Sequence, residues 1–179
     1  MSPEIPSNPE ARHVPAIEGW FTLDDAKPAL LGSRCTTCRT YVFPPTLPAC
    51  PNPDCPSTAI GIDGTFETVE LSRRGRIWSY TDSRYEPPPP YVAADPYIPF
   101  CLAAVELADE KLVVLGQVAP GFTVDDLHLG MEVELVLGRL NSGGENGPGD
   151  QPGAIVWNWR PVTVVGSPGD AAARGGTDL

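Results

Sequence analysis

Residues 35–55 read CTTCRTYVFPPTLPACPNPDC, and this stretch decides the fold of the chain. Cys35 and Cys38 flank one tight turn, and Cys50 and Cys55 form a second pair after eleven intervening residues. Two such turns place four thiolates around one cation, a pattern typical of a zinc ribbon. Four thiolates saturate zinc and leave no position for water or substrate. The spacing therefore predicts a structural zinc site rather than a catalytic one.

Two alternatives stay open for these cysteines. Iron in a rubredoxin-like centre would use the same four ligands, and a pair of disulfides would use the same residues. Four residues separate Cys50 from Cys55, where two are usual, and this departure loosens the expected geometry. Clustered thiols nevertheless favour a metal over the dispersed framework of a secreted disulfide domain. The fifth cysteine, Cys101, lies in the apolar run PFCLAAVEL and is expected to be a buried, inert thiol.

The composition of the chain excludes several classes of function. With 12 basic and 23 acidic side chains the formal charge is -11, so a nucleic-acid backbone would be repelled by most of the surface. No run of about 18 apolar residues is present, and the first residues lack the pattern of a signal peptide. We therefore expect a soluble cytoplasmic protein that binds neither membranes nor nucleic acid.

A short helix is expected ahead of the cysteine module, in the run WFTLDDAKPALL. Thr22 could cap it, Asp24 and Asp25 would lie in its first turn, and Pro28 would end it. The module itself has few apolar residues, so it needs a metal to fold.

Strand-like segments follow the cysteine module. They are rich in Val, Ile, Leu and aromatic residues, are separated by turn signals, and predict an antiparallel barrel or sandwich. These segments are residues 65–71, 76–81, 100–107, 112–118, 131–137 and 154–164. A short helical turn near Val124, ended by Gly130, is expected to plug the bottom of the barrel.

The order of several short motifs resembles a known family. These are WF, CTTC, YVFPP, CPNPDC, GRIWSYT, PPPYV, PFCLAAVEL, LGMEVEL and WNWRPV, which together span about residues 19–164. The chain resembles the zinc-ribbon plus OB-fold family catalogued as domain of unknown function thirty-five. The resemblance implies a mainly β protein with a short helix and rubredoxin-like zinc ribbon (19–63) followed by a small antiparallel OB-fold barrel (64–164). Composition predicts the rest: the Pro-rich residues 1–18 form an extended arm, with a plain disordered terminus as the alternative, and the polar, Gly-rich residues 165–179 form a disordered tail.

The resemblance also implies a function. Members of this family look like noncatalytic, acyl-CoA-binding accessory subunits of thiolase-fold enzymes, including thiolases, lipid-transfer-type aldolases and related hydratase complexes. We therefore expect a heterotetramer with such an enzyme, coenzyme A or acyl-CoA as a shared ligand, and a role in breaking carbon–carbon bonds during lipid degradation. Steroid, aromatic and acetoacetyl acyl groups all remain open.

Local chemistry suggests where coenzyme A could bind. Three neighbouring arginines make a positive spot suited to phosphates, which Arg84 could extend, and tyrosines around the prolines at 87–90 could line a pantetheine channel or dock a partner. A solvated turn and an ordinary barrel-covering loop are the alternatives. The candidate coenzyme-binding residues are Arg73, Arg74, Arg76, Tyr80, Tyr91 and Phe100, with Tyr85 and Tyr97 near them.

No catalytic constellation is predicted. Neither His13 nor His128 has a nearby nucleophile in a recognisable pattern, and the paired acids at 24–25 and 125–126 suit helix starts. Two other functions compete with the accessory subunit. One is a single-stranded nucleic-acid-binding zinc-ribbon and OB-fold module, and the other is a self-sufficient hydrolase of acyl-CoA thioesters.

Overall fold

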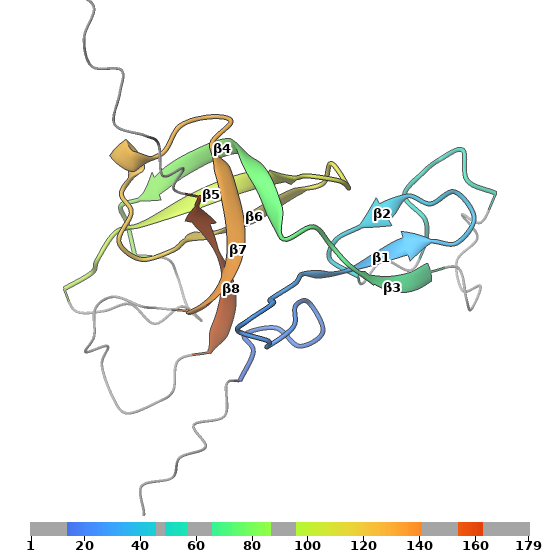
Figure 1. The fold of residues 1–179 in the computed structure, drawn as a ribbon, viewed down its shortest axis with the longest axis horizontal. Coiled ribbons are helices and arrows are strands. Elements are labelled where there is room, and N and C mark those ends of the chain that lie inside the picture. The colour runs from blue at the N-terminus through green and yellow to red at the C-terminus, as the bar shows by residue number, and fades with distance from the viewer. Residues whose placement is uncertain (1–13, 46–48, 57–65, 87–95, 141–153, 163–179) are drawn as a thin grey trace, which may run out of the picture.

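A small three-stranded sheet and a closed five-stranded barrel make up the protein, and the expected mainly β fold is confirmed (Figure 1). The computed structural model describes residues 14–45, 49–56, 66–86, 96–140 and 154–162. The candidate Tyr91, His13, the prolines at 87–90, most of the arm and the tail lie outside these residues. Within them, no helix has the length and apolar character needed to span a bilayer.

The small sheet has the strand order β2-β1-β3 and carries the cysteine module. Its strands are β1 (Leu31–Cys35), β2 (Tyr41–Val42) and β3 (Phe66–Glu70), and both pairings are antiparallel. The sequence pattern places residues 65–71 in the barrel, but all five residues of β3 pair with β1 instead. A strand's own pattern of side chains does not specify its pairing partner, so this exchange could not be seen in the sequence.

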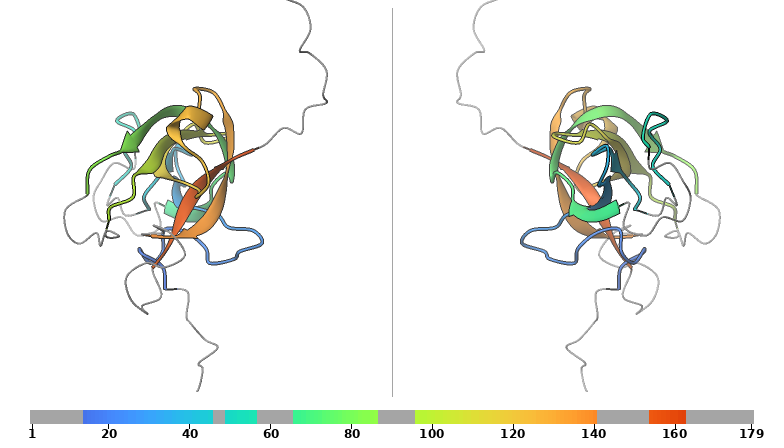
Figure 2. Two further views of the ribbon diagram at one scale, coloured as in Figure 1. Left: turned by 90° about the vertical axis from the view of Figure 1, so that its left-hand side faces the viewer. Right: turned by 90° about the vertical axis from the view of Figure 1, so that its right-hand side faces the viewer.

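The barrel closes in the order β4-β5-β6-β8-β7, with β7 returning to β4. The strands curve around a common axis when the molecule is viewed from either end (Figure 2). Their bounds are β4 (Arg74–Ser83), β5 (Phe100–Leu107), β6 (Val113–Val118), β7 (Glu132–Arg139) and β8 (Ile155–Pro161). Four contacts are antiparallel, whereas β6 and β8 run parallel over two residue pairs. A ring with an odd number of strands cannot be antiparallel throughout, so one parallel contact is unavoidable.

The prediction of a short helix after Trp20 is wrong. Phe21 and Leu30 instead form an isolated antiparallel bridge, and the Asp24 carboxylate accepts hydrogen bonds from the N–H groups of Ala26 and Lys27. Such side-chain bonds give the backbone an alternative to a helix, and Pro28 limits continuation. The helical turn expected near Val124 is confirmed as η1 (Val124–Asp126) between β6 and β7.

One apolar core joins the two parts. Phe21, Leu30 and Leu71 belong to the same buried cluster as the barrel interior. Trp157 of β8 contacts Trp20, Phe21 and Phe43, with ring centroids 6.3, 5.6 and 6.0 Å away. The cysteine module is therefore fixed to the barrel by packing as well as by the chain.

Candidate metal centre

The four predicted ligands converge at the end of the small sheet that is far from the barrel. All four Sγ atoms lie within 4.8 Å of one another, with Cys35 and Cys55 3.7 Å apart and Cys38 and Cys50 3.4 Å apart. A tetrahedral zinc site with Zn–S bonds of about 2.3 Å requires sulfurs roughly 3.8 Å apart. The donor set and its spacing thus fit a single zinc ion.

The disulfide alternative does not fit this geometry. A disulfide needs sulfurs about 2.05 Å apart, and none of these four described cysteines forms one in the structure. Cys35, Cys50 and Cys55 are buried and Cys38 is partly exposed, so a bound ion would be shielded from solvent on most sides. Cys101 is buried away from this cluster, and burial raises the pKa of its thiol, as expected for an inert side chain.

Two tight turns aim the thiols at one point. In the first, the Arg39 N–H donates to the Cys35 carbonyl and the Cys35 N–H donates to the Thr40 carbonyl, both at 2.9 Å, with Arg39 in the left-handed region at φ 65°. In the second, the Cys55 N–H donates to the Asn52 carbonyl at 3.0 Å. The extra length between Cys50 and Cys55 is therefore taken up by a turn, and both sulfurs still reach the cluster.

Hydrogen bonds to sulfur prepare part of the site for a cation. The Thr40 hydroxyl lies 3.1 Å from the Cys38 sulfur, and hydrogen bonds from that hydroxyl and from the Thr40 N–H lower the pKa of Cys38 to about 6. Burial raises the pKa of Cys50 to about 12, although the Asn52 N–H opposes this shift. Of Cys38 and Cys50, Cys38 therefore loses its proton more readily, and a cation must displace the proton of Cys50.

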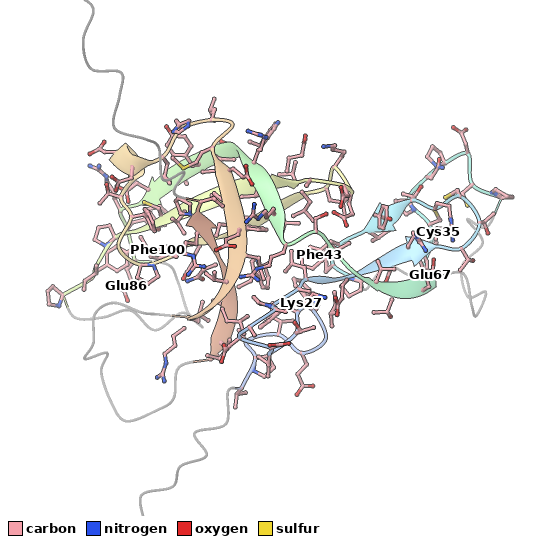
Figure 3. The ribbon with its side chains drawn as sticks, in the orientation of Figure 1. Lys27, Cys35, Phe43, Glu67, Glu86 and Phe100 are labelled. Atoms are coloured by element: carbon pink, nitrogen blue, oxygen red, sulfur yellow. The ribbon has the colours of Figure 1, made fainter. Side chains whose placement is uncertain are left out.

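Hydrogen bonds between charged side chains connect the strands of the cysteine module on its surface. Glu67 of β3 accepts hydrogen bonds from Arg34 at 2.7 Å and from Arg39 at 3.4 Å, and it lies close to the cysteine cluster (Figure 3). Arg34 also lies 5.8 Å from the centre of the Tyr41 ring. No local pattern in the sequence singles out Thr40 or Glu67, because their roles depend on turn geometry and on the pairing of β3.

The structure does not gather the three candidate arginines into one free positive spot. Arg73 donates to the carbonyl oxygens of Leu135 and Ala26, at 3.1 and 3.3 Å, and thereby holds the N-terminal segment on the barrel. Arg74 forms an ion pair with Glu132 at 3.2 Å. Arg76 donates to the neutral Gly130 carbonyl at 3.0 Å.

The candidate aromatic residues lie elsewhere on the barrel. Tyr80 is partly buried and packs against the barrel core, and Phe100 begins β5 at the end remote from Cys35 (Figure 3). Tyr80 follows Arg76 by four positions along β4, which corresponds to roughly 13 Å. Nearby, Arg84 pairs with Asp82 at 2.7 Å, and the Tyr97 hydroxyl donates to the Ser83 carbonyl at 2.8 Å. The arginines and the described aromatic residues therefore form two separate groups.

Family models match both parts of the chain. Residues 25–61 match the model described as ChsH2, rubredoxin-like zinc ribbon domain, and residues 68–138 match ChsH2, C-terminal OB-fold domain. The match to a zinc ribbon favours zinc as the ion of the four-cysteine cluster.

Three known proteins are similar over longer stretches. A DUF35 domain-containing scaffold protein of Methanocaldococcus jannaschii is 29% identical over 118 residues, which are 66% of this chain and 74% of the relative. A probable enoyl-CoA hydratase alpha subunit of Thermomonospora curvata is 32% identical over 127 residues, 69% of this chain and 35% of that longer protein. A chain in a solved structure of an Ltp2-ChsH2(DUF35) aldolase is 27% identical with a TM-score of 0.52, covering 74% of this chain and 84% of that one.

Proposed function

Because the chain belongs to the family defined by the ChsH2 zinc-ribbon and OB-fold domains, we propose that it is a noncatalytic scaffold subunit. Its partner in this proposal is a thiolase-fold enzyme that acts on carbon–carbon bonds of acyl-CoA substrates. The observation that carries the proposal is the similarity, at 27% identity, to a chain of the Ltp2-ChsH2(DUF35) aldolase. The M. jannaschii relative is itself described as a scaffold protein, which supports the same role.

The geometry of the metal centre supports a scaffold role. Four thiolates leave zinc no open coordination position, so the ion would fold the module and not activate water or substrate. The module is joined to the barrel through the contacts of Trp157 with Trp20, Phe21 and Phe43. A partner that binds either part would therefore be held in a fixed position relative to the other.

Coenzyme A belongs to the proposal as a ligand shared with the partner. The outward-facing arginines Arg74 and Arg76 are the groups on this chain that could meet its phosphates, and Arg73 is assigned instead to holding the N-terminal segment. Tyr80, Tyr91 and Phe100 remain candidates for the pantetheine arm. In this proposal most of the coenzyme's contacts come from the enzyme subunit.

Co-expression with a thiolase-fold enzyme from the same organism tests the proposal. The affinity-tagged chain is expected to copurify with that enzyme as a heterotetramer, measured by light scattering, and the complex is expected to cleave an acyl-CoA substrate that neither chain cleaves alone. Isolation of the chain without any thiolase-fold protein would refute the scaffold role. Turnover of an acyl-CoA by the chain alone would favour a self-sufficient enzyme.

Binding of single-stranded nucleic acid is the competing function, and the charge distribution counts against it. The formal charge is -11, and among the described residues six arginines are each paired with a carboxylate, namely Arg34, Arg39, Arg73, Arg74, Arg84 and Arg160. Single-strand binders require a positive groove along which the backbone can lie. Retention of oligonucleotides on a filter at low salt would revive this alternative.

A further inference from the structure

Strands β4, β5 and β6 are neighbours in the barrel wall (Figure 1). Exposed and partly exposed apolar side chains form a group on these three strands. Trp78 is 65% exposed, Leu115 is 59% exposed and Val113 is 48% exposed. Leu102 and Ala104 of β5 lie between them and are partly exposed. We call these five residues the barrel-wall patch.

The strand register makes the patch continuous. Ala104 pairs with Leu115 of β6 on one side and with Ser79 of β4 on the other, and Trp78 is the extra residue that directly precedes Ser79 at the irregularity in β4. Leu102 and Val113 flank this central row on the same face of the sheet, because side chains alternate along a strand. A small alanine therefore lies between two large apolar side chains.

The bulge in β4 explains why a tryptophan faces outward here. Ile77 is 2% exposed and pairs with Val105 inside the barrel, whereas Tyr80 pairs with the fully buried Ala103. One extra residue is needed for both Ile77 and Tyr80 to face the core, and that residue is Trp78. The bulge thus leaves the core packing intact and exposes a large aromatic side chain. Such an exposed apolar surface lowers solubility unless another molecule covers it.

The surroundings of the patch have the composition of a protein interface. Polar side chains border the apolar centre: Arg76 and Glu106 at one end, and Thr81 and Gln117 at the other. The Glu106 carboxylate lies 3.8 Å from the Lys111 ammonium group, so the negative charge of Glu106 in this rim is neutralised by a neighbouring residue of the same chain. An apolar centre with an aromatic anchor and a polar rim is typical of a site where another protein binds.

Size and charge select the occupant. Three strands, each about 4.8 Å wide and roughly six residues long, give a face of about 290 Å², whereas a stable complex buries about 800 Å² on each partner. The interface must therefore continue beyond the patch onto the surrounding surface, and only an occupant as large as a folded protein can cover that area. A second copy of this chain would also carry a formal charge of -11, and like net charges oppose association.

From these observations we infer that the barrel-wall patch is the surface on which the partner enzyme subunit docks. The inference rests on the proposed scaffold function and adds the location of the interface. The matching surface of the enzyme is apolar at its centre, with a pocket for the Trp78 indole, and its net charge is less acidic than that of this chain.

Binding measurements on the purified enzyme subunit test the inference. Trp78→Ser and Leu115→Ser are each expected to weaken binding at least about 30-fold, the loss that corresponds to an interface hot spot. Leu23→Ser is the matched control, because Leu23 is an exposed leucine outside the patch, and it is expected to stay within about threefold of wild type. Zinc content and thermal unfolding of each variant establish that it is folded; should one variant fail to fold, the other carries the test.

The outcomes separate the inference from the proposed function. If the wild-type chain binds the enzyme and both patch variants bind equally well, the location is wrong while the scaffold role stands. If the wild-type chain does not bind the enzyme, the scaffold role itself fails and the inference fails with it. A dimer of the chain alone that is lost in Trp78→Ser would assign the patch to a second copy and overturn the inference.

Discussion

Trp157 connects the barrel to the segments that carry the metal centre, so its replacement should separate the two parts. Its indole contacts Trp20, Phe21 and Phe43, and its Nε1–H donates to the Leu115 carbonyl at 3.1 Å. The side chain is 8% exposed. Trp157→Ala removes all of these contacts at once, and Trp157→Phe removes the hydrogen bond while keeping an aromatic ring.

The expected loss can be worked from these contacts. Three aromatic pairs contribute roughly 0.5–1.5 kcal/mol each beyond their buried area, and the hydrogen bond contributes about 1 kcal/mol. The total agrees with the range of about 3–5 kcal/mol observed when a buried tryptophan becomes alanine. Trp157→Phe should lower the free energy of unfolding by about 1–2 kcal/mol, since it loses mainly the hydrogen bond. Trp78→Ala is the matched control, since that tryptophan is 65% exposed, and it should change stability by less than about 0.5 kcal/mol.

Urea unfolding provides the assay, followed in parallel by circular dichroism for the barrel and by a colorimetric chelator for released zinc. In the wild type both signals should change together, because the parts share one core. In Trp157→Ala the two transitions should separate and shift to lower urea. An alanine variant as stable as the Trp78→Ala control, with coincident transitions, would refute the view that Trp157 couples the two parts.

Three further predictions concern the metal, a carboxylate and a glycine. Cys38→Ser removes one of the four thiolates, so zinc measured by elemental analysis should fall well below one ion per chain, and a variant that keeps its zinc would contradict the assigned site. The hydrogen bond from Arg160 lowers the pKa of Glu134 below its ordinary value of 4.5, so this carboxylate stabilises the fold above that pH and the stabilisation is lost as pH falls through the lower folded value. Glu134→Gln should therefore cost about 1 kcal/mol near neutral pH and progressively less in acid, measured by thermal unfolding, and a cost that does not depend on pH would count against this pairing. A Cβ at Gly75 would lie 2.4 Å from the Glu106 carbonyl oxygen, so Gly75→Ala should lower the free energy of unfolding by about 3 kcal/mol in a denaturant titration, and a neutral effect would show that the strands can separate there.

Much of the barrel could be predicted because its strands are rich in apolar residues, and in β5 and β6 buried and more exposed residues alternate along the whole strand. The expected segment at 100–107 coincides with β5, whose residues alternate between partly exposed and buried along its whole length. The helix after Trp20 was wrong because Asp24 and Thr22 satisfy backbone groups locally, and such bonds favour turns and helix starts alike. The prediction that residues 65–71 belong to the barrel was wrong because the partner of a strand is set by distant segments, whereas the pattern of its side chains is local.

The arginines illustrate a second limit. Their closeness in sequence suggests one positive spot, and Arg74 and Arg76 do share the outer face of β4. Each of the three nevertheless has a different hydrogen-bond partner, and these partners come from segments distant in the sequence. Net charge along a segment therefore carries little information about which charges remain available to a ligand.

The sequence by itself determined the metal centre, because thiolates are ligands by chemistry and the two cysteine pairs are only eleven residues apart, and their four sulfurs do converge. It also determined most of the barrel strands, since their apolar pattern can be recognised from neighbouring residues. Only the tertiary structure decided that β3 completes the ribbon, that Trp157 joins ribbon to barrel, and that a bulge turns Trp78 outward. These features depend on which distant segments meet and in what register, and that is fixed by the packing of the whole core.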